Sequence, residues 1–363
     1  MSDGVLIIGG GLAAQRCAEA LRQGEYEGPV RIVSAEPHAP YDRPPLSKEL
    51  LAGDREHEEI TFRPDEWHEE KEIELVLGDP AVALDPEARL VTLESGAELP
   101  YEDLVIATGS RPVMLADAEG LENVQALRTV DDALRLRDAL QPGSRLGVVG
   151  AGLISQEVAS TASKRDVNVT LIEAEPLPLA RALHPDLALW LVEMQRSAGI
   201  DVRLDTAVTK IVAEEDRAVA LELSDGSRVE VDHVLVAIGI RPADEWLPEG
   251  LEKLLERPEI HAAGDVAGGE HWEAAGRQGR AAAQEILGNP PAEEALSSWW
   301  TDIHGVRIQG FGNSNDADEL QIDGDMDEPS FTVVALRDGT PVGALAVACP
   351  REVPRLRELL SGA

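Results

Sequence analysis

The chain has 363 residues, enough for two or three domains, and 68 acidic against 32 basic residues, a formal net charge of −36. Such a field repels nucleic acid and anionic membranes, and no apolar run is long enough to span a bilayer, so neither is an expected partner. Two cysteines, Cys17 and Cys349, exclude a disulfide framework and a four-thiolate cluster, and no metal site is predicted.

The first part of the chain alternates predicted strands and helices. Residues 5–8 predict a strand that enters a glycine turn and a helix, without the basic region and cleavage site of a signal peptide, so a cytoplasmic location is expected. Residues 31–33 predict the next strand. Residues 89–93 and 97–99 bracket Glu94-Ser95-Gly96 as a small hairpin, and residues 104–106 predict a buried strand that leads to a turn at Gly109.

The same scheme repeats over residues 111–236. A helix near residues 130–140 precedes a second strand, glycine turn and helix at 146–155, and residues 169–172 and 202–204 predict further strands. A meander around Ser224-Asp225-Gly226 leads to an apolar strand that ends in Gly239. The repetition indicates two α/β units of similar design.

The remainder predicts one long helix and a strand-rich module. Residues 260–262 predict a strand before Ala263-Gly264-Asp265, and residues 271–287 have the pattern of a helix. From about residue 298 the pattern favours strands, with 331–336 and 342–348 flanking the turn at 337–340, and a short helix finishes the chain.

The two glycine turns are dinucleotide fingerprints. Each follows a strand and opens a helix, and each is followed by a second strand that leads to an acid, Glu36 or Glu173. Glycine lets the backbone approach a pyrophosphate, whose charge is favoured at a helix N-terminus. One match alone is weak, but two, each with its own acid, predict two dinucleotides that meet and exchange electrons.

A longer set of motifs resembles one family. Tyr41-Asp42-Arg43-Pro44-Pro45-Leu46-Ser47-Lys48 is similar to the RPPLSK motif of flavin-dependent ferredoxin reductases of the putidaredoxin-reductase type, and the order of both fingerprints, Ala107-Thr108-Gly109, Ala263-Gly264-Asp265 and Trp299-Trp300-Thr301-Asp302 extends the resemblance nearly end to end. It implies an α/β fold with two Rossmann-like dinucleotide-binding domains and a C-terminal α+β interface domain. The expected boundaries are 1–110 with 237–297 for FAD, 111–236 for NADH and 298–363 for the interface domain.

The resemblance also implies an activity and a set of site residues. The expected activity is hydride transfer from NADH to FAD, then single-electron transfer to a small [2Fe–2S] ferredoxin that feeds a cytochrome P450 or Rieske-type oxygenase. Positions that match FAD-binding residues are Gly9, Gly11, Leu12, Ala13, Ala14, Glu36, Arg43, Pro45, Lys48, Val82, Ala107, Thr108, Gly109, Arg128, Gly264, Asp265, Trp272 and Trp300. Positions on the NADH side are Gly150, Gly152, Leu153, Ile154, Glu173, Arg181 and Gly239.

Lys48 and Glu157 are the expected catalytic pair, as residues that tune the flavin and not as proton shuttles. A cation near the flavin favours its anionic reduced form, and the resemblance pairs Lys48 with Glu157, which should be hydrogen-bonded if buried. Glu173 repels a 2′-phosphate, so NADH is expected over NADPH. Trp300 either covers the flavin or serves in packing, as adjacent tryptophans often do.

Two departures from the family pattern and several alternatives remain. Ser155 stands at the third glycine position of the second fingerprint, and is expected to push its helix outward or to find a local bond. Residues 247–257 replace a longer segment, which predicts a trimmed flavin domain.

The acceptor could also be rubredoxin or a quinone, or the chain could be an NADH-sensing binding protein similar to apoptosis-inducing factor. The acidity reflects compositional bias or adaptation to high salt, and the sequence leaves the oligomeric state open.

Overall fold

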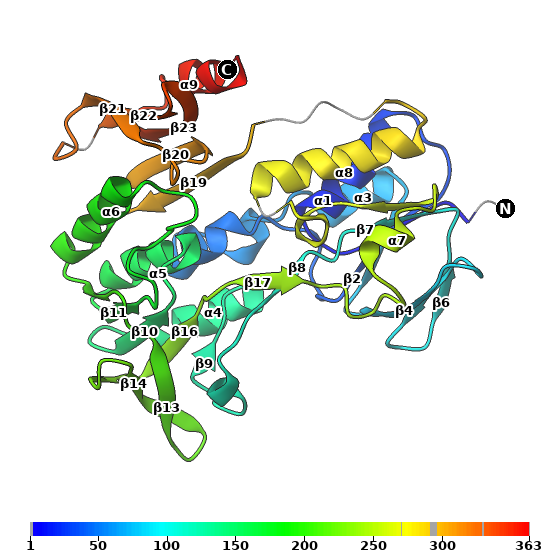
Figure 1. The fold of residues 1–363 in the computed structure, drawn as a ribbon. Helices are drawn as coiled ribbons and strands as arrows, with labels where there is room; N and C mark the ends of the chain where they lie inside the picture. The colour runs from blue at the N-terminus through cyan, green and yellow to red at the C-terminus, as the bar shows by residue number, and fades with distance from the viewer. Residues whose placement is uncertain (1–2, 270, 291–295, 329, 363) are drawn as a thin grey trace. The chain divides into compact units, whose positions relative to one another are not determined.

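The computed structural model describes residues 3–269, 271–290, 296–328 and 330–362, which divide into two compact units (Figure 1). The first unit comprises Met1–Asp42, His57–Arg111 and Ile240–Glu294, and the second comprises Arg43–Glu56, Pro112–Gly239 and Ala295–Ala363. By its contacts, the short stretch that carries the predicted Arg43 and Lys48 therefore belongs with the second unit, although the sequence assigns it to the FAD-binding domain.

The first unit is built on a parallel five-stranded sheet in the order β18-β7-β1-β2-β3. Its strands are β1 (Val5–Ile8), β2 (Val30–Ser34), β3 (Ile73–Leu77), β7 (Asp103–Ile106) and β18 (Ile260–Ala262). β1 is apolar along its whole length and β7 is apolar after Asp103, because both faces of the sheet are covered, as in dinucleotide-binding domains.

Helices cover one face of this sheet and a small antiparallel sheet packs on the other. The helical face holds α1 (Leu12–Gln23), α3 (Asp65–Glu70) and α8 (Trp272–Ile286), and in Figure 1 the yellow α8 runs beside the blue α1. Their approach is close, since a Cβ at Gly279 would lie 2.1 Å from the Ala13 carbonyl oxygen. The opposite face holds β4 (Ala81–Asp85), β5 (Leu90–Leu93) and β6 (Glu98–Pro100), which confirm the predicted hairpin.

The shortened segment 247–257 belongs to the apolar core between the parallel sheet and the antiparallel sheet of β4, β5 and β6. It forms α7 (Leu251–Leu254), and Leu254 is fully buried with Trp246, Leu247 and Leu251 beside it. The trimmed segment therefore still closes the apolar face of the sheet.

The second unit repeats the design with a parallel sheet in the order β12-β11-β10-β16-β9. The strands are β9 (Val124–Gln125), β10 (Arg145–Val149), β11 (Asn168–Ile172), β12 (Asp201–Arg203) and β16 (His233–Val236). Its helices are α4 (Val130–Ala139), α5 (Leu153–Ser163) and α6 (Pro185–Ser197), and an antiparallel sheet is formed by β13 (Val208–Glu214), β14 (Arg217–Leu223) and β15 (Arg228–Glu230). α4 begins at a capping box of Thr129 and Asp132, which explains its sharp start.

The C-terminal residues of the second unit form an antiparallel sheet in the order β19-β20-β23-β22-β21 with one helix, α9 (Val353–Ser361). The strands are β19 (Ser298–Ile303), β20 (Val306–Gly312), β21 (Glu319–Gly324), β22 (Phe331–Arg337) and β23 (Thr340–Val347). Asp338 and Gly339 make the β22–β23 turn, both with positive φ, as a two-residue hairpin requires. This sheet shares a core with α6 that includes Leu187, Leu191 and Phe331.

The segment Arg43–Glu56 packs on the helices of the second unit. It forms a 3-10 turn, η1 (Pro44–Ser47), and the short α2 (Glu49–Ala52), whose Leu50 and Leu51 are fully buried. Two of the passages of the chain from one unit to the other lie at the two-stranded sheet of β8 (Ser110–Pro112) and β17 (Ile240–Pro242). Within the described residues, no helix is both long and apolar enough to cross a membrane.

Candidate cofactor and electron-transfer sites

The first glycine turn connects β1 to α1 and has the shape of a phosphate cradle. Gly9 has a φ of 134°, and a Cβ there would lie 2.0 Å from the Ala107 carbonyl oxygen, so only glycine fits. Gly11 is the N-cap of α1, faces open space, and supplies no side chain to the N–H groups of the first helical turn. Those amides are thus available to a pyrophosphate, and the turn fits the FAD assignment.

Glu36 follows the next strand of the first unit and is held in place. Its carboxylate accepts a 2.5 Å hydrogen bond from the Tyr41 hydroxyl, and its backbone N–H donates to the Ser34 hydroxyl at 3.1 Å. A carboxylate fixed after the second strand is where a ribose-binding acid belongs. Ala14, at the third fingerprint position, is fully buried in the α1 core.

The other predicted FAD residues of this unit follow β7 and β18. Asp265 accepts a 2.6 Å hydrogen bond from the Ser110 hydroxyl, one residue after the predicted Ala107-Thr108-Gly109. Gly264 has a φ of 83°, and its N–H donates to the Gln278 side chain at 2.9 Å. These residues and the glycine turn follow strands of one parallel sheet, and such sheets bind ligands beyond the carboxyl ends of their strands.

Two further predictions have a defined place in the first unit. The indole N–H of Trp272, the first residue of α8, donates to the Asp42 carboxylate at 2.6 Å. Val82 on β4, an edge strand of its sheet, is 46% exposed. An exposed apolar side chain on this sheet is compatible with contact to a base.

The second glycine turn, between β10 and α5, repeats the geometry of the first. Gly150 has a φ of 94°, and a Cβ there would meet the Ala237 carbonyl oxygen at 2.4 Å. Gly152 faces open space as the N-cap of α5, with no side-chain cap. Gly239, with a φ of 134°, follows β16, and Leu153 and Ile154 open the helix. The turn fits a second pyrophosphate.

Glu173 connects this turn to the end of β11. One carboxylate oxygen accepts the Ala151 backbone N–H at 2.7 Å, and the other accepts the Glu175 N–H at 2.9 Å. The side chain is thereby oriented before any ligand arrives. A carboxylate is an acceptor with about four lone-pair sites, so capacity remains for ribose hydroxyls.

Of the two outcomes expected for Ser155, an outward shift of its helix or a local hydrogen bond, the bond does not form among the described residues. The side chain is fully buried in α5, and its hydroxyl has no hydrogen-bond partner among the described residues. The serine is therefore accommodated at the cost of an unmade hydrogen bond.

The predicted pair of Lys48 and Glu157 forms within the second unit. The Lys48 ammonium lies 3.0 Å from a Glu157 carboxylate oxygen, and the two side chains are 13% and 7% exposed. Glu157 also accepts hydrogen bonds from the Ser47 hydroxyl, from the Thr301 hydroxyl at 2.8 Å and from the Asp302 N–H at 3.4 Å. One buried anion is thus matched by one cation and three neutral donors, as a buried pair requires.

Sequence reasoning gave no role to Ser47 or Thr301. Both lie inside motifs that were recognised, next to Lys48 and to the tryptophan pair respectively. They reach Glu157 from positions 110 and 144 residues away in the sequence. The only sequence signal for these two residues was that they lie inside the recognised motifs.

Arg43 and Arg128 are brought together in the same unit. The Arg43 guanidinium donates to the Arg128 carbonyl oxygen, and the Arg128 N–H donates to the capping Asp132 carboxylate at 3.0 Å. Pro45 is buried in η1.

Arg181, predicted on the NADH side, is exposed, and its carbonyl oxygen accepts a hydrogen bond from the Asn313 side-chain amide at 2.9 Å. The predicted FAD residues thus divide between the two units, with Arg43, Pro45, Lys48, Arg128 and Trp300 in the second.

The adjacent tryptophans point to different sides of β19. Trp299 is buried against Gly310, where a Cβ would lie 2.2 Å from its ring. Trp300 is partly exposed, and the Arg307 guanidinium lies 5.3 Å from its ring centre. Packing therefore accounts for Trp299, and Trp300 is the one with an accessible face.

The two cysteines do not form a redox centre. Cys17 is fully buried in α1, and burial raises the pKa of its thiol to about 12, so the reactive thiolate is absent at neutral pH. Cys349 is also a free thiol, with its sulfur 3.0 Å from the Ser330 hydroxyl.

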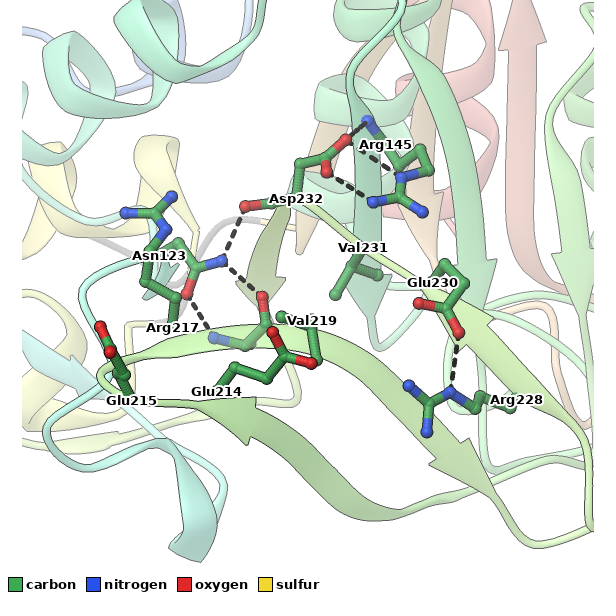
Figure 2. Close-up of a pocket in the computed structure, with 11 residues that line it drawn as sticks. Asn123, Arg145, Glu214, Glu215, Arg217, Val219, Arg228, Glu230, Val231 and Asp232 are labelled. Atoms are coloured by element: carbon green, nitrogen blue, oxygen red, sulfur yellow. Dashed lines mark hydrogen bonds and ion pairs between the residues drawn. The ribbon is translucent and has the colours of Figure 1, made fainter.

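A cavity of about 570 Å³ lies elsewhere in the second unit, along β14 and β15, and Figure 2 shows the side chains that line it. Two ion pairs line it: Arg145 lies 2.6 Å from Asp232, and Arg228 lies 2.7 Å from Glu230. The Asn123 amide donates to two backbone carbonyl oxygens. None of the predicted site residues lines this cavity.

The chain is similar over most of its length to known families and proteins. Residues 3–279 match the family described as pyridine nucleotide-disulphide oxidoreductase, and residues 298–363 match the family described as reductase C-terminal. The ferredoxin reductase subunit of 5,5′-dehydrodivanillate O-demethylase from a Sphingobium species is 36% identical, over 92% of this chain and 87% of that protein. The ferredoxin–NAD(+) reductase subunit of the benzene 1,2-dioxygenase system from Pseudomonas putida is 35% identical, over 97% and 91%. The crystal structure of the covalent putidaredoxin reductase–putidaredoxin complex matches with a TM-score of 0.92 and 29% identity, over 99% of this chain and 93% of that one.

Proposed function

Because the chain belongs to the pyridine nucleotide-disulphide oxidoreductase family, we propose that it passes electrons from NADH through FAD to a small [2Fe–2S] ferredoxin that feeds an oxygenase. The protein is an NADH-dependent oxidoreductase of the ferredoxin–NAD(+) reductase type, with FAD as its cofactor. The observation that carries the proposal is the pair of open glycine turns, each with an acid after the next strand. A cytoplasmic location remains part of the proposal.

The first unit would hold the FAD. Gly9 and Gly11 would present the α1 amides to the pyrophosphate, Glu36 would bind the adenosine ribose, and Asp265 would bind the ribityl chain. Bound FAD supplies hydride acceptance and single-electron release. The residues position the cofactor and set the electrostatic field around it, because hydride transfer needs no side-chain acid or base.

The second unit would hold the NADH. Gly150 and Gly152 present the α5 amides, and Glu173 accepts hydrogen bonds from the ribose hydroxyls. Glu175 follows two residues later and is exposed. A 2′-phosphate would face both carboxylates, so like-charge repulsion selects NADH over NADPH.

Lys48 is the residue proposed to tune the cofactor. Its ammonium is buried beside Glu157, whose carboxylate is anchored by Ser47 and Thr301, so the charge has a fixed position. A fixed cation in a poorly solvated place stabilises a developing negative charge more than a mobile surface lysine does.

Stopped-flow mixing of the FAD-loaded protein with NADH tests the first half of the proposal. The flavin absorption band should bleach with NADH far faster than with NADPH, and a purified protein that is colourless and takes up no FAD would refute the assignment. Lys48→Ala should slow flavin reduction or shift the flavin potential. An unchanged rate and potential would show that the lysine has another role.

An NADH–cytochrome c assay with and without a panel of [2Fe–2S] ferredoxins tests the acceptor. Turnover that depends on a ferredoxin supports the proposal. Turnover restored only by rubredoxin or a quinone would replace the acceptor and keep the reductase activity, while slow reduction with no acceptor turnover would favour an NADH-sensing binding protein.

A further inference from the structure

We propose that Gln156, Gln195 and His304 form a buried hydrogen-bond relay that positions the second glycine turn for the NADH pyrophosphate. The inference rests on the proposed function, since it assigns further residues to the NADH site. It makes the β19–β20 turn, in the C-terminal sheet, a support for nucleotide binding.

The relay runs without a break from that turn to Ala151. The His304 ring nitrogen Nε2 lies 2.8 Å from the Gln195 side-chain oxygen. The Gln195 amide donates to the Gln156 side-chain oxygen at 2.6 Å and to the Gln156 carbonyl at 3.1 Å. The Gln156 amide then donates to the Ala151 carbonyl oxygen at 3.2 Å. Ala151 is the middle residue of the glycine turn.

The donors and acceptors are consistent in direction. Each glutamine accepts with its oxygen and donates with its nitrogen, and a neutral His304 with its proton on Nε2 completes the series. Gln156 and Gln195 are fully buried in α5 and α6. Buried polar groups that satisfy one another fix a single geometry, and loss of one member leaves a neighbour unpaired.

The far end of the relay is also anchored. His304 has a φ of 51° in the two-residue turn between β19 and β20, a conformation that is uncommon for a residue other than glycine. Its N–H donates to the Ser160 hydroxyl on α5 at 2.7 Å. Backbone and ring of one turn residue thus bind the two helices that carry the relay.

The functional consequence follows from peptide geometry. The Ala151 carbonyl and the Gly152 N–H belong to one planar trans peptide, so they point in opposite directions. When the Gln156 amide holds the carbonyl on one side, the Gly152 N–H is directed to the other. The Ala151 N–H is held by Glu173, which fixes the preceding peptide as well. Both peptides of the turn are therefore set before the nucleotide binds.

The first fingerprint shows that this arrangement is not a general property of the fold. Gln15 occupies the position that corresponds to Gln156 and is equally buried. Its amide donates to Glu19 at 3.3 Å and its oxygen lies 3.0 Å from His68, so its side chain forms bonds away from the turn. The relay to the turn is particular to the NADH side.

The test measures ADP-ribose affinity of the FAD-loaded protein by calorimetry, because ADP-ribose carries the pyrophosphate without the nicotinamide. Gln156→Met and Gln195→Met keep side-chain length and remove the hydrogen bonds, and each should weaken binding about three- to tenfold, within the range that one neutral hydrogen bond supplies. His304→Phe, at the far end, should weaken binding in the same direction. KM for NADH should rise with kcat unchanged, the signature of lost ground-state binding.

Gln141→Met is the matched control, since Gln141 is exposed after α4 and, among the described contacts, its side-chain amide donates only to the Asp138 carbonyl oxygen. It should leave ADP-ribose affinity unchanged. If either buried glutamine variant fails to fold, the half-buried His304→Phe variant decides the question. The relay is refuted if the folded variants bind ADP-ribose as the wild type does. If the wild type itself binds no ADP-ribose, the proposed NADH site fails and not the relay alone.

Discussion

Replacing Lys48 with methionine should destabilise the protein by about 3 kcal/mol. The ammonium is 3.0 Å from the Glu157 carboxylate, and both side chains are almost entirely buried. Removal of one partner of a buried ion pair typically costs about 3–5 kcal/mol, because an uncompensated charge is left behind. Here Ser47, Thr301 and the Asp302 amide still donate to the carboxylate, which places the loss at the lower end of that range.

A double-mutant cycle separates the charge effect from lost packing. Glu157→Gln removes the charge that Lys48→Met leaves unpaired, so the double variant should be more stable than Lys48→Met alone, by about 1 kcal/mol or more. Urea unfolding at pH 7, followed by far-ultraviolet circular dichroism, measures the free energies of the apo and FAD-loaded proteins. Lys210→Met, at an exposed position of β13, is the matched control and should change stability by less than about 0.5 kcal/mol. A Lys48→Met variant as stable as this control would refute the reasoning.

Three further predictions concern stability. Ser155→Ala should raise the melting temperature, because the buried, unpartnered hydroxyl costs about 1–3 kcal/mol, and an equal or lower value in calorimetry would show that the hydroxyl is satisfied. Burial alone would lower the pKa of His261, but the carboxylates of Asp103 and Glu285 outweigh burial and raise it. The stability that His261 contributes is complete below about pH 6.5 and is lost as the pH rises through the raised pKa, so the advantage over His261→Gln should shrink between pH 6 and 8 in urea titrations. With a net charge of −36, a melting temperature that rises from low to molar salt would support salt adaptation, and a flat one would leave compositional bias.

The elements that sequence reasoning placed well are those with a local signal. The helix expected at 271–287 is α8, Trp272–Ile286, and the turn around Asp338-Gly339 joins β22 to β23, because Asp-Gly favours the positive φ of a two-residue hairpin. The glycine turns could also be predicted from the sequence. Gly9 and Gly150 each need a residue without a Cβ, because a carbonyl oxygen of another strand end lies against them.

The donors around Glu157 had no such signal. A serine 110 residues earlier and a threonine 144 residues later become its partners only when η1 and β19 pack on α5. The identity of a hydrogen-bond partner at that separation depends on packing, and composition or periodicity does not encode it. Of the groups around Glu157, the family resemblance predicted only Lys48. For the same reason Gln156 and Gln195, buried on two different helices, could not be paired from the sequence.

In the proposed assignment, one backbone motif serves a resident cofactor at the first fingerprint and a visiting substrate at the second. The first turn is backed by packing: Ala14 fits the third position, and α8 approaches α1 so closely that Gly279 is required. The second carries Ser155 at the third position, and its peptides are held instead by Glu173 and Gln156. A turn that is already ordered loses little conformational freedom when a nucleotide binds. Affinity can then come from a few hydrogen bonds, without the extensive burial that would make NAD⁺ slow to leave. We therefore expect substitutions in the relay to change nucleotide affinity while FAD retention stays unchanged.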